Sequence, residues 1–190
     1  VTYHSGIDID PFCSSDGREV AFVSTRSNSA EIWVKNMESG ELECITGDGK
    51  IKNYPVISPD GKRIAWIRKT EGILTIYDRS TGRMKELKIG ENIFFPPSWS
   101  PDSRYLAVTR GIRGKTKICL TDSGGEVLLQ LTGSDHNEAN PAWSPEGKRL
   151  AVLTKKDETL GIRIISGLEH YFNRMAKLRK GAFRPQILEE

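Results

Sequence analysis

Residues 141–153 read PAWSPEGKRLAVL, and three earlier stretches of the chain repeat this pattern. The four copies begin at Pro11, Pro55, Pro97 and Pro141, so successive copies are 44, 42 and 44 residues apart. Each copy contains an apolar segment, a tight turn and a second apolar segment. A repeat of this length with strand and turn signals is typical of one blade of a β-propeller.

The turn inside each copy follows from the chemistry of its residues. In the second copy, Pro59 has its φ preset for the second turn position, and Gly61 supplies the positive φ that the chain needs after the turn. Ser103 replaces this glycine in the third copy, where we expect strain, because a residue with a Cβ is disfavoured at positive φ. One acidic residue in each turn is expected to be structural: Asp16, Asp60, Asp102 and Glu146.

The segment after the turn is apolar at every position, which predicts a strand with both faces covered by neighbouring blades. A small residue recurs at one position of this strand, as Ala21, Ala65, Ala107 and Ala151. This predicts a close approach between adjacent sheets. Two further strand segments and a turn follow in each of the first three copies, so four antiparallel strands would complete a blade.

We therefore predict an all-β fold, a β-propeller of four four-stranded blades in a partial or small propeller, with a C-terminal α-helix. The blades are expected near residues 11–46, 55–87, 97–132 and 141–165, within a repeat domain at 1–165. The C-terminal helix and tail would occupy 166–190.

The pattern Pro-x-Trp-Ser-Pro-Asp-Gly-Lys-x-Ile-Ala, followed by Ile-Tyr, Gly and Leu-Thr, resembles the repeat of TolB-like propellers, also called the WD40-like or PD40 repeat. The resemblance covers residues 1 to about 165 and is specific for fold. It implies a non-catalytic scaffold that presents a loop face to a protein partner, in an extracytoplasmic (periplasmic or exported) location. TolB itself partners with envelope lipoproteins and the Tol machinery, but no residue of this chain identifies such a partner.

Composition excludes several other classes of function. A formal charge of +3 is too small to indicate a nucleic-acid partner, and no apolar run is long enough to cross a membrane. No glycine-rich phosphate loop follows a strand, so no cofactor is expected. The three cysteines have neither metal-type spacing nor a disulfide framework, and are expected to be unpaired structural thiols.

The fourth copy changes character after its third strand. Ser166 and Glu169 form a capping box, and apolar residues at helical spacing continue to Leu178 before Gly181 ends the pattern. The apolar stripe of this predicted helix would pack on a blade. The alternative is a basic amphipathic helix that docks on a membrane surface or in a partner groove.

Val1-Thr2 matches Ile45-Thr46 and Leu131-Thr132, the closing residues of a blade. Three arrangements follow: an arc of a larger propeller with additional blades, a small closed four-bladed ring, or two chains that pair through their open faces. An arc would expose an apolar blade face, which favours association into a homo-oligomer.

Propellers gather the loops between strands on one face, where partners usually bind. On these loops we expect an acidic mouth beside exposed aromatic side chains, which are typical of protein-binding patches. The candidate partner-binding residues are Asp8, Asp10, Tyr54, Phe94, Phe95, Glu138 and Asn140. The alternative is that Phe94 and Phe95 fill space between blades.

Two enzyme-linked alternatives come from the same resemblance. Some TolB-like propellers are lyases that hold a metal with histidines, and His4 and His136 lie on equivalent loops here. We expect no metal site, because solvated loop histidines are the simpler interpretation. The repeat also occurs in the propeller gate of oligopeptidases, but no Gly-x-Ser-x-Gly motif is present, so the chain would be at most the non-catalytic part of such an enzyme.

Overall fold

The computed structural model describes residues 6–91, 93, 95–133, 135–169, 171 and 172. Among these residues, fifteen strands form four antiparallel sheets, each built from strands that are consecutive in the chain. The first sheet contains β1 (Asp8–Cys13), β2 (Glu19–Ser24), β3 (Glu31–Asn36) and β4 (Leu42–Cys44). The second contains β5 (Asn53–Ile57), β6 (Arg63–Arg68), β7 (Ile73–Asp78) and β8 (Met84–Lys88).

The third sheet contains β9 (Ser98–Trp99), β10 (Tyr105–Ile112), β11 (Lys115–Asp122) and β12 (Val127–Gln130). The fourth contains β13 (Asn137–Trp143), β14 (Leu150–Lys156) and β15 (Thr159–Ile165), and no described strand pairs with the outer edge of β15. The predicted repeats thus fold into separate sheets, the last of which has three strands.

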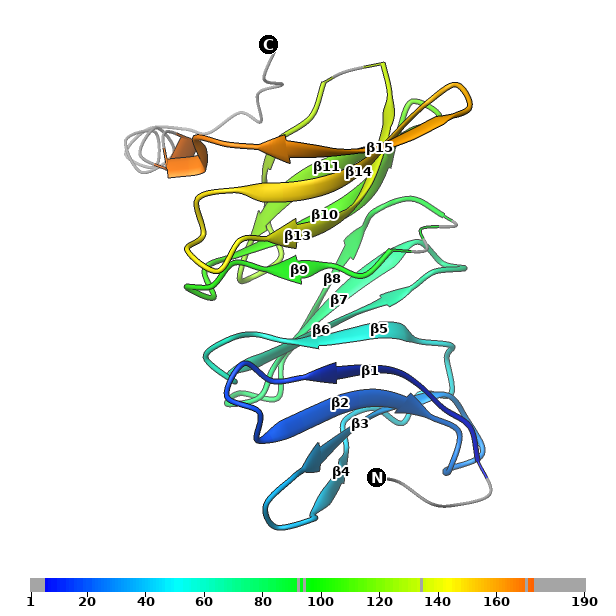
Figure 1. Cartoon of the computed structure of the whole chain (residues 1–190). Coiled ribbons are helices and arrows are strands. Elements are labelled where there is room, and N and C mark those ends of the chain that lie inside the picture. Colours follow the sequence, from blue (N-terminus) through cyan, green and yellow to red (C-terminus); the bar gives the residue numbers. More distant parts are fainter. Residues whose placement is uncertain (1–5, 92, 94, 134, 170, 173–190) are drawn as a thin grey trace.

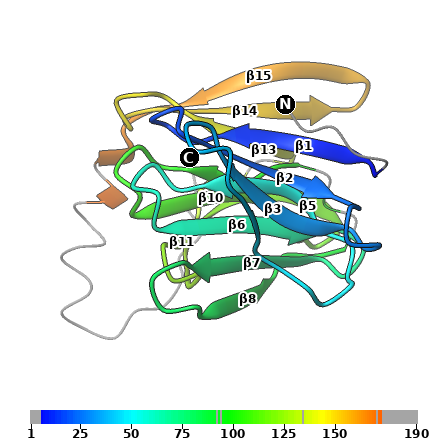
Figure 2. The same cartoon turned by 90° about the horizontal axis from the view of Figure 1, so that it is seen from below.

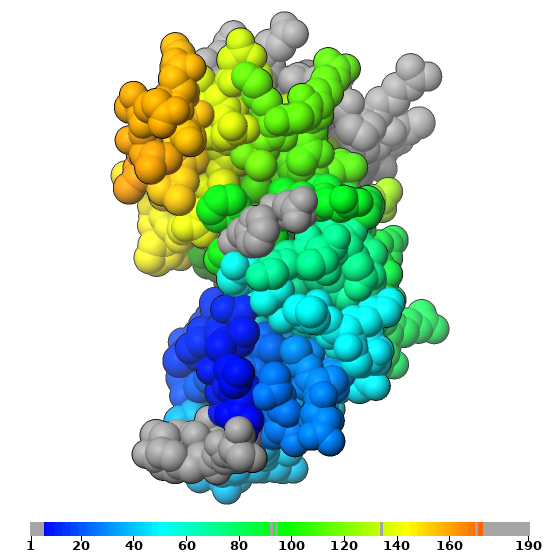
Figure 3. Space-filling model, turned by 90° about the vertical axis from the view of Figure 1, so that its right-hand side faces the viewer, coloured from blue at the N-terminus to red at the C-terminus, as the bar shows by residue number. Residues whose placement is uncertain are grey.

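The four sheets stack face to face in the order of the sequence (Figure 1). They lie over one another when viewed along the stack, with the first sheet nearest the viewer (Figure 2). The space-filling view shows the first and fourth sheets at opposite ends (Figure 3). The chain is therefore an open arc, and the alternative of a closed four-bladed ring is wrong for this structure.

Three apolar clusters lie between successive sheets and hold the stack together. Tryptophans reinforce two of these junctions by donating hydrogen bonds to the preceding sheet, at its first strand, which is the inner strand of the blade. The Trp99 indole N–H donates to the Val56 carbonyl at 3.2 Å, and that of Trp143 donates to the Ser98 carbonyl at 3.1 Å. The repeat position of Trp99 and Trp143 therefore links neighbouring blades.

The serine that opens each tight turn is the centre of its hydrogen-bond network. The Ser58 carbonyl accepts from the Gly61 N–H at 2.8 Å, and the Ser58 hydroxyl accepts from the Arg63 N–H at 2.9 Å. The same hydroxyl donates to Asp60 Oδ1 at 2.6 Å. Ser14 and Ser100 make all three contacts in their own turns, so the turn acids are structural there, as expected.

Ser103 adopts the positive φ predicted for it, at 60°. The structure also shows what the hydroxyl contributes: its Oγ accepts from the Asp60 N–H at 2.9 Å, across the junction between the second and third sheets. The side chain is only 5% exposed. The interblade hydrogen bond offsets the backbone strain, which the sequence pattern did not indicate.

Substitution of Ala65 by leucine should destabilise the fold. Ala21, Ala65 and Ala107 are completely buried between sheets, so three added carbons at Ala65 have no space and force neighbours off their rotamers. We expect the free energy of unfolding to fall by about 1–3 kcal/mol, measured by urea unfolding. An unchanged unfolding midpoint would contradict close packing at this position.

A few residues at the start of the region predicted as a C-terminal helix pack on the third and fourth sheets. Leu168, Glu169, Tyr171 and Phe172 have helical backbone conformation, and Leu168 is fully buried. The Phe172 ring stacks on Tyr105, with 4.3 Å between ring centroids. No helix is among the elements of the described residues, so the predicted C-terminal helix is not supported, and 173–190 lie outside those residues.

Acid should destabilise the turn between β7 and β8, which begins at Asp78. Hydrogen bonds from the Ser80 hydroxyl and the Thr81 N–H lower the pKa of Asp78 to about 2. A depressed pKa in the folded state means that this stabilisation is present above the ordinary value near 4 and is lost as the pH falls towards 2. We expect the free energy of unfolding to decrease over this range, and the decrease to be smaller in Asp78→Asn.

Urea unfolding at pH 5, pH 3.5 and pH 2.5 would measure this difference. Glu158→Gln, which changes an exposed carboxylate in the β14–β15 turn, is the matched control. Identical pH dependence of Asp78→Asn and the wild type would contradict the prediction.

Candidate functional site: a groove on the loop face

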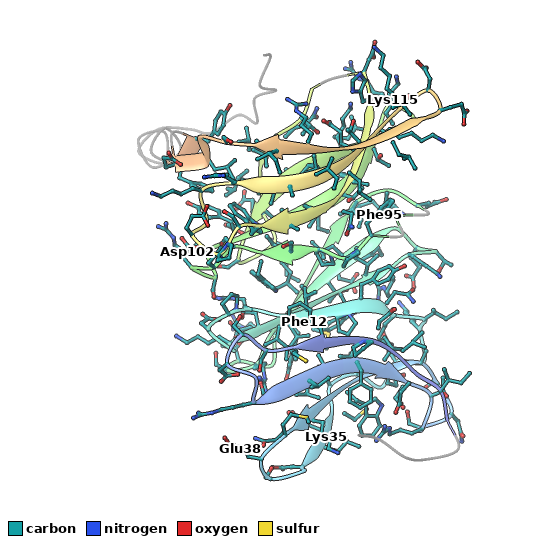
Figure 4. All side chains as sticks on the ribbon, in the orientation of Figure 1. Phe12, Lys35, Glu38, Phe95, Asp102 and Lys115 are labelled. Atoms are coloured by element: carbon teal, nitrogen blue, oxygen red, sulfur yellow. The ribbon has the colours of Figure 1, made fainter. Side chains whose placement is uncertain are left out.

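A groove of about 540 Å³ lies between the β8–β9 connection and the third and fourth sheets. Its apolar surface is formed by Ile93, Phe95, Ala139, Leu153 and Leu160. Polar side chains surround this surface: Glu91, Lys115, Thr116, Asn137, Thr154 and Lys155. Phe95 and Lys115 lie on the side of the stack opposite the tight turn that contains Asp102 (Figure 4).

Three glycines hold the connection that forms one wall of the groove. The Ile89 N–H donates to the Gly72 carbonyl at 2.8 Å, and the Ile89 carbonyl accepts from the Gly111 N–H at 2.7 Å. A Cβ at Gly72 would lie 2.3 Å from the Gly90 carbonyl oxygen, and one at Gly90 would lie 3.1 Å from the Gly111 backbone. A side chain at Gly72 would clash with this backbone, and one at Gly90 would be strained at its φ of 101°, so glycine at both positions allows the close approach.

Phe95 is half-buried in the groove wall and remains a candidate contact residue. Its neighbour Phe94 lies outside the described residues. Pro96 follows at the repeat position where the other three blades have a residue with positive φ. Proline cannot adopt positive φ, and the inner strand β9 is shortened to two residues here.

The residues at that repeat position form bulges in the backbone of the inner strands. Asp10, Tyr54 and Asn140 have φ of 53°, 55° and 54°, and each lies at a β-bulge in an inner strand. The Tyr54 N–H donates to the Asp10 carboxylate at 3.0 Å, which joins the first two sheets. Their shared spacing before the anchoring proline therefore marks a bulge.

The predicted acidic mouth is not formed. Asp8 and Asp10 belong to the first sheet, and Glu138 and Asn140 to the fourth, at the other end of the stack (Figure 1). Asp8 also forms an ion pair with Arg26 at 3.1 Å. The prediction grouped these loops by their equivalent repeat positions, but the first and fourth sheets do not come together in this structure.

Glu138 is fully buried in an ionic cluster. Its Oε1 accepts from Arg163 Nη1 at 3.0 Å, and its Oε2 lies 4.0 Å from Lys117 Nζ. Burial lowers the pKa of Lys117, and the nearby Glu138 carboxylate opposes this effect. Glu138 is thus unavailable to a partner in this structure.

The junction between the first and second sheets contains the same pair with the charges exchanged. Lys52 Nζ lies 2.8 Å from Glu31 Oε2, and both side chains are 1% exposed. Burial opposes ionisation of Glu31, but hydrogen bonds from Lys52 and Thr46 hold its pKa below the ordinary value. Lys52 and Glu138 occupy one repeat position, three residues before an anchoring proline, and Glu31 and Lys117 occupy another. Comparison of these positions would have shown that the charges are exchanged between the two blades.

The structure gives no support to a metal centre. No group of three or more His, Cys, Asp or Glu side chains among the residues described here is arranged to hold a metal ion. His136 Nδ1 lies 3.5 Å from the Thr154 hydroxyl, and His4 lies outside the described residues. Cys13 and Cys44 are exposed free thiols, and burial raises the pKa of the free thiol of Cys119 to about 11.

Comparisons with known proteins agree with the repeat and with the stacked sheets. The family model described as the TolB beta propeller domain (PD40) matches residues 1–92. A TolB homologue of Chlorobium chlorochromatii is 33% identical over 143 residues, which are 74% of this chain and 32% of that protein. The chain belongs to the TolB-like β-propeller family.

Solved structures of TolB-like propellers have the same fold. TolB from Acinetobacter baumannii superimposes with a TM-score of 0.72 at 24% identity, covering 85% of this chain and 41% of that one.

An uncharacterised peptidase of Bacillus subtilis, YuxL, is 30% identical over 157 residues, which are 79% of this chain and 22% of the peptidase. This TolB-like chain thus spans about a third of the TolB homologue and less of the peptidase.

No helix in the described part of this TolB-like propeller is long and apolar enough to span a membrane. The lysines around the groove give this part of the loop face a mixed apolar and basic character. A second hollow of about 440 Å³ continues it over Lys115, Asp135, His136, Asn137, Lys155, Lys156 and Asp157.

Proposed function

We propose that this chain is a non-catalytic, protein-binding scaffold that presents its loop face to a protein partner. The groove beside Phe95 is the observation that supports the proposal. Its apolar surface can bury apolar side chains of a partner, and Lys115 and Lys155 are cations on its rim. A protein segment with apolar and acidic side chains has the complementary chemistry.

Substitution in the groove tests this proposal. Phe95→Asp removes an aromatic contact and places a carboxylate where we expect acidic side chains, and Lys155→Glu reverses a charge on the rim. We expect a partner captured from a cell extract, then purified, to bind the wild type and to lose at least tenfold in affinity with either variant. Such a loss corresponds to about 1.4 kcal/mol.

The matched control is Met84→Asp, because Met84 is 51% exposed on β8 and lies outside the groove. Equal affinity of the partner for Phe95→Asp, Lys155→Glu and Met84→Asp would refute the groove as the binding site. We propose an extracytoplasmic location on the resemblance to TolB. Detection of the native protein only in the cytoplasmic fraction would refute it.

The second candidate is the non-catalytic propeller part of a larger enzyme, which the similarity to the Bacillus peptidase favours. The distinguishing measurement is made on the native gene product. A product much larger than this chain that reacts with a fluorophosphonate probe for serine hydrolases would support the enzyme candidate. A product without such labelling would support the scaffold.

A further inference from the structure

Where the first and second sheets meet near the tight turns, an ion pair fills the outer corner of the junction. Arg79 directly follows β7, and its guanidinium reaches back to the first sheet. It donates to the two Glu19 carboxylate oxygens at 2.7 and 2.8 Å, and its Nη2 lies 3.9 Å from Glu43 Oε2. One side chain of the second sheet thus occupies this corner and pairs with two carboxylates of the first sheet.

The corner between the third and fourth sheets is filled by apolar side chains instead. Tyr105 stands at the repeat position of Glu19, eight residues after an anchoring proline. Its ring stacks with that of Phe172, with 4.3 Å between the ring centroids. Leu168 is fully buried in the apolar cluster against which Tyr105 packs. Side chains of this chain therefore fill the corner here as well.

The corner between the second and third sheets has neither filling. Ser123 follows β11 as Arg79 follows β7, so a short side chain replaces the bridging guanidinium. The two carboxylates are replaced as well, because cations stand at their repeat positions, Arg63 and Lys85. A hollow of about 360 Å³ remains between the two sheets, and each of them is covered on its other face by a further sheet (Figure 1).

The hollow between the second and third sheets is positively charged. Three cations line it, Arg63, Arg83 and Lys85, against one carboxylate, that of Asp78. Asp78 already accepts hydrogen bonds within its own turn, and its Oδ2 lies 3.9 Å from Arg63 Nε. No carboxylate in the described part of the chain pairs with Arg83 or Lys85, and both side chains are exposed. An anionic group that enters the hollow therefore has two cations available.

One wall of the hollow is apolar. Ile76 is 4% exposed and Met84 is 51% exposed. A Cβ at Gly125 would lie 3.2 Å from Lys85 Cγ and 3.4 Å from Ile76 Cδ1, so the Lys85 stem is held against the third sheet. An aliphatic stem that ends in a carboxylate, as in glutamate, complements both the wall and the cations, whereas a bare phosphate would leave the wall uncovered.

We propose that the corner between the second and third sheets binds an acidic side chain of glutamate type that belongs to a protein partner. The carboxylate pairs with Lys85 and Arg83, and the aliphatic stem covers the apolar wall. This is the ionic corner of the first junction with the charges exchanged and the inserted side chain supplied by the partner. Arg63 directly follows the tight turn of its blade, so the site lies on the side marked by Asp102, opposite the groove beside Phe95 (Figure 4).

Titration of the whole chain with two capped peptides tests this proposal. The probe is acetyl-Leu-Glu-Leu-Glu-amide, and its neutral counterpart is acetyl-Leu-Gln-Leu-Gln-amide. We expect the acidic peptide to cause saturable changes in the amide NMR shifts of residues 81–85 and 123–125, and the neutral peptide to cause none. Lys85→Gln should weaken binding of the acidic peptide by about fivefold, the upper end for a partly exposed ion pair.

The matched control is Lys148→Gln, which removes the same charge from an exposed position in the tight turn of the fourth blade. Its affinity for the acidic peptide should stay within about twofold of the wild type. A further variant, Ser123→Glu, supplies the carboxylate from within the chain. It should abolish binding of the acidic peptide and raise the urea midpoint of unfolding, whereas Ser123→Gln, which has the same length without the charge, should not raise the midpoint.

Several results would overturn the proposal: no saturable binding of the acidic peptide, equal binding of the neutral peptide, shift changes confined to other residues, or undiminished binding by Lys85→Gln. Citrate that bound as tightly as the acidic peptide would also overturn it, because the site would then recognise a free small anion. The NMR spectrum shows whether each variant is folded. If Lys85→Gln is misfolded, Arg83→Gln replaces it with the same expected loss.

Discussion

Lys52→Met should remove about 3–5 kcal/mol from the free energy of unfolding, because it leaves the buried Glu31 carboxylate without its cation. Lys52 Nζ lies 2.8 Å from Glu31 Oε2, and neither side chain is more than 1% exposed. Urea unfolding at pH 7, followed by tryptophan fluorescence, measures the loss. Lys50→Met is the control, since that side chain is half exposed, and its effect should be within about 0.5 kcal/mol.

The junction between the third and fourth sheets suggests a second variant of the same pair. Lys117 and Glu138 occupy the equivalent positions with the charges exchanged, so the fold accepts either polarity. The double variant Glu31→Lys, Lys52→Glu should therefore lose less stability than the sum of the two single variants. Strict additivity of the single losses would mean that the two side chains do not interact.

Trp99→Ala should have an effect of similar size, a loss of about 3–5 kcal/mol, because it opens a cavity at the junction of the second and third sheets. Trp99 is 7% exposed in an apolar cluster that includes Val56, Ile76 and Leu106. Trp99→Phe keeps most of the buried ring but deletes the hydrogen bond to the Val56 carbonyl. We expect that variant to lose about 1 kcal/mol.

Thermal and urea unfolding of the two Trp99 variants separate packing from hydrogen bonding. Met84→Ala, on an exposed outer strand, is the control and should unfold like the wild type. If Trp99→Ala and Trp99→Phe lost the same amount, the indole N–H contact would dominate the junction. If neither lost stability, the stacked junction would not contribute to folding.

Local chemistry made the blades predictable. The spacing of Pro11, Pro55, Pro97 and Pro141 located four repeats, and the alternation of apolar segments with Ser-Pro-Asp-Gly turns specified the strand order within each repeat. The buried alanines followed from the same pattern, because a residue type that recurs at one repeat position indicates one environment. All of these features depend on contacts within a blade or between neighbours.

The candidate site was predicted less well, because its members come from separate blades. Phe95 was identified as an exposed aromatic on a loop, and it does line the groove. Asp10, Tyr54 and Asn140 were chosen for their position before a proline, where the structure shows a bulge with positive φ. Glu138 was expected in an acidic mouth on the loop face, but its carboxylate is buried beside Lys117 and Arg163.

The sequence alone determined the structure of each blade, since turn geometry and strand pairing depend on residues close together in the chain. Tertiary structure alone decided how the four units are arranged: an open stack in which the first and fourth sheets never meet (Figure 1). That arrangement depends on how each sheet packs on the next, through apolar clusters whose members lie far apart in the sequence. For the same reason, only the structure could show where the groove opens.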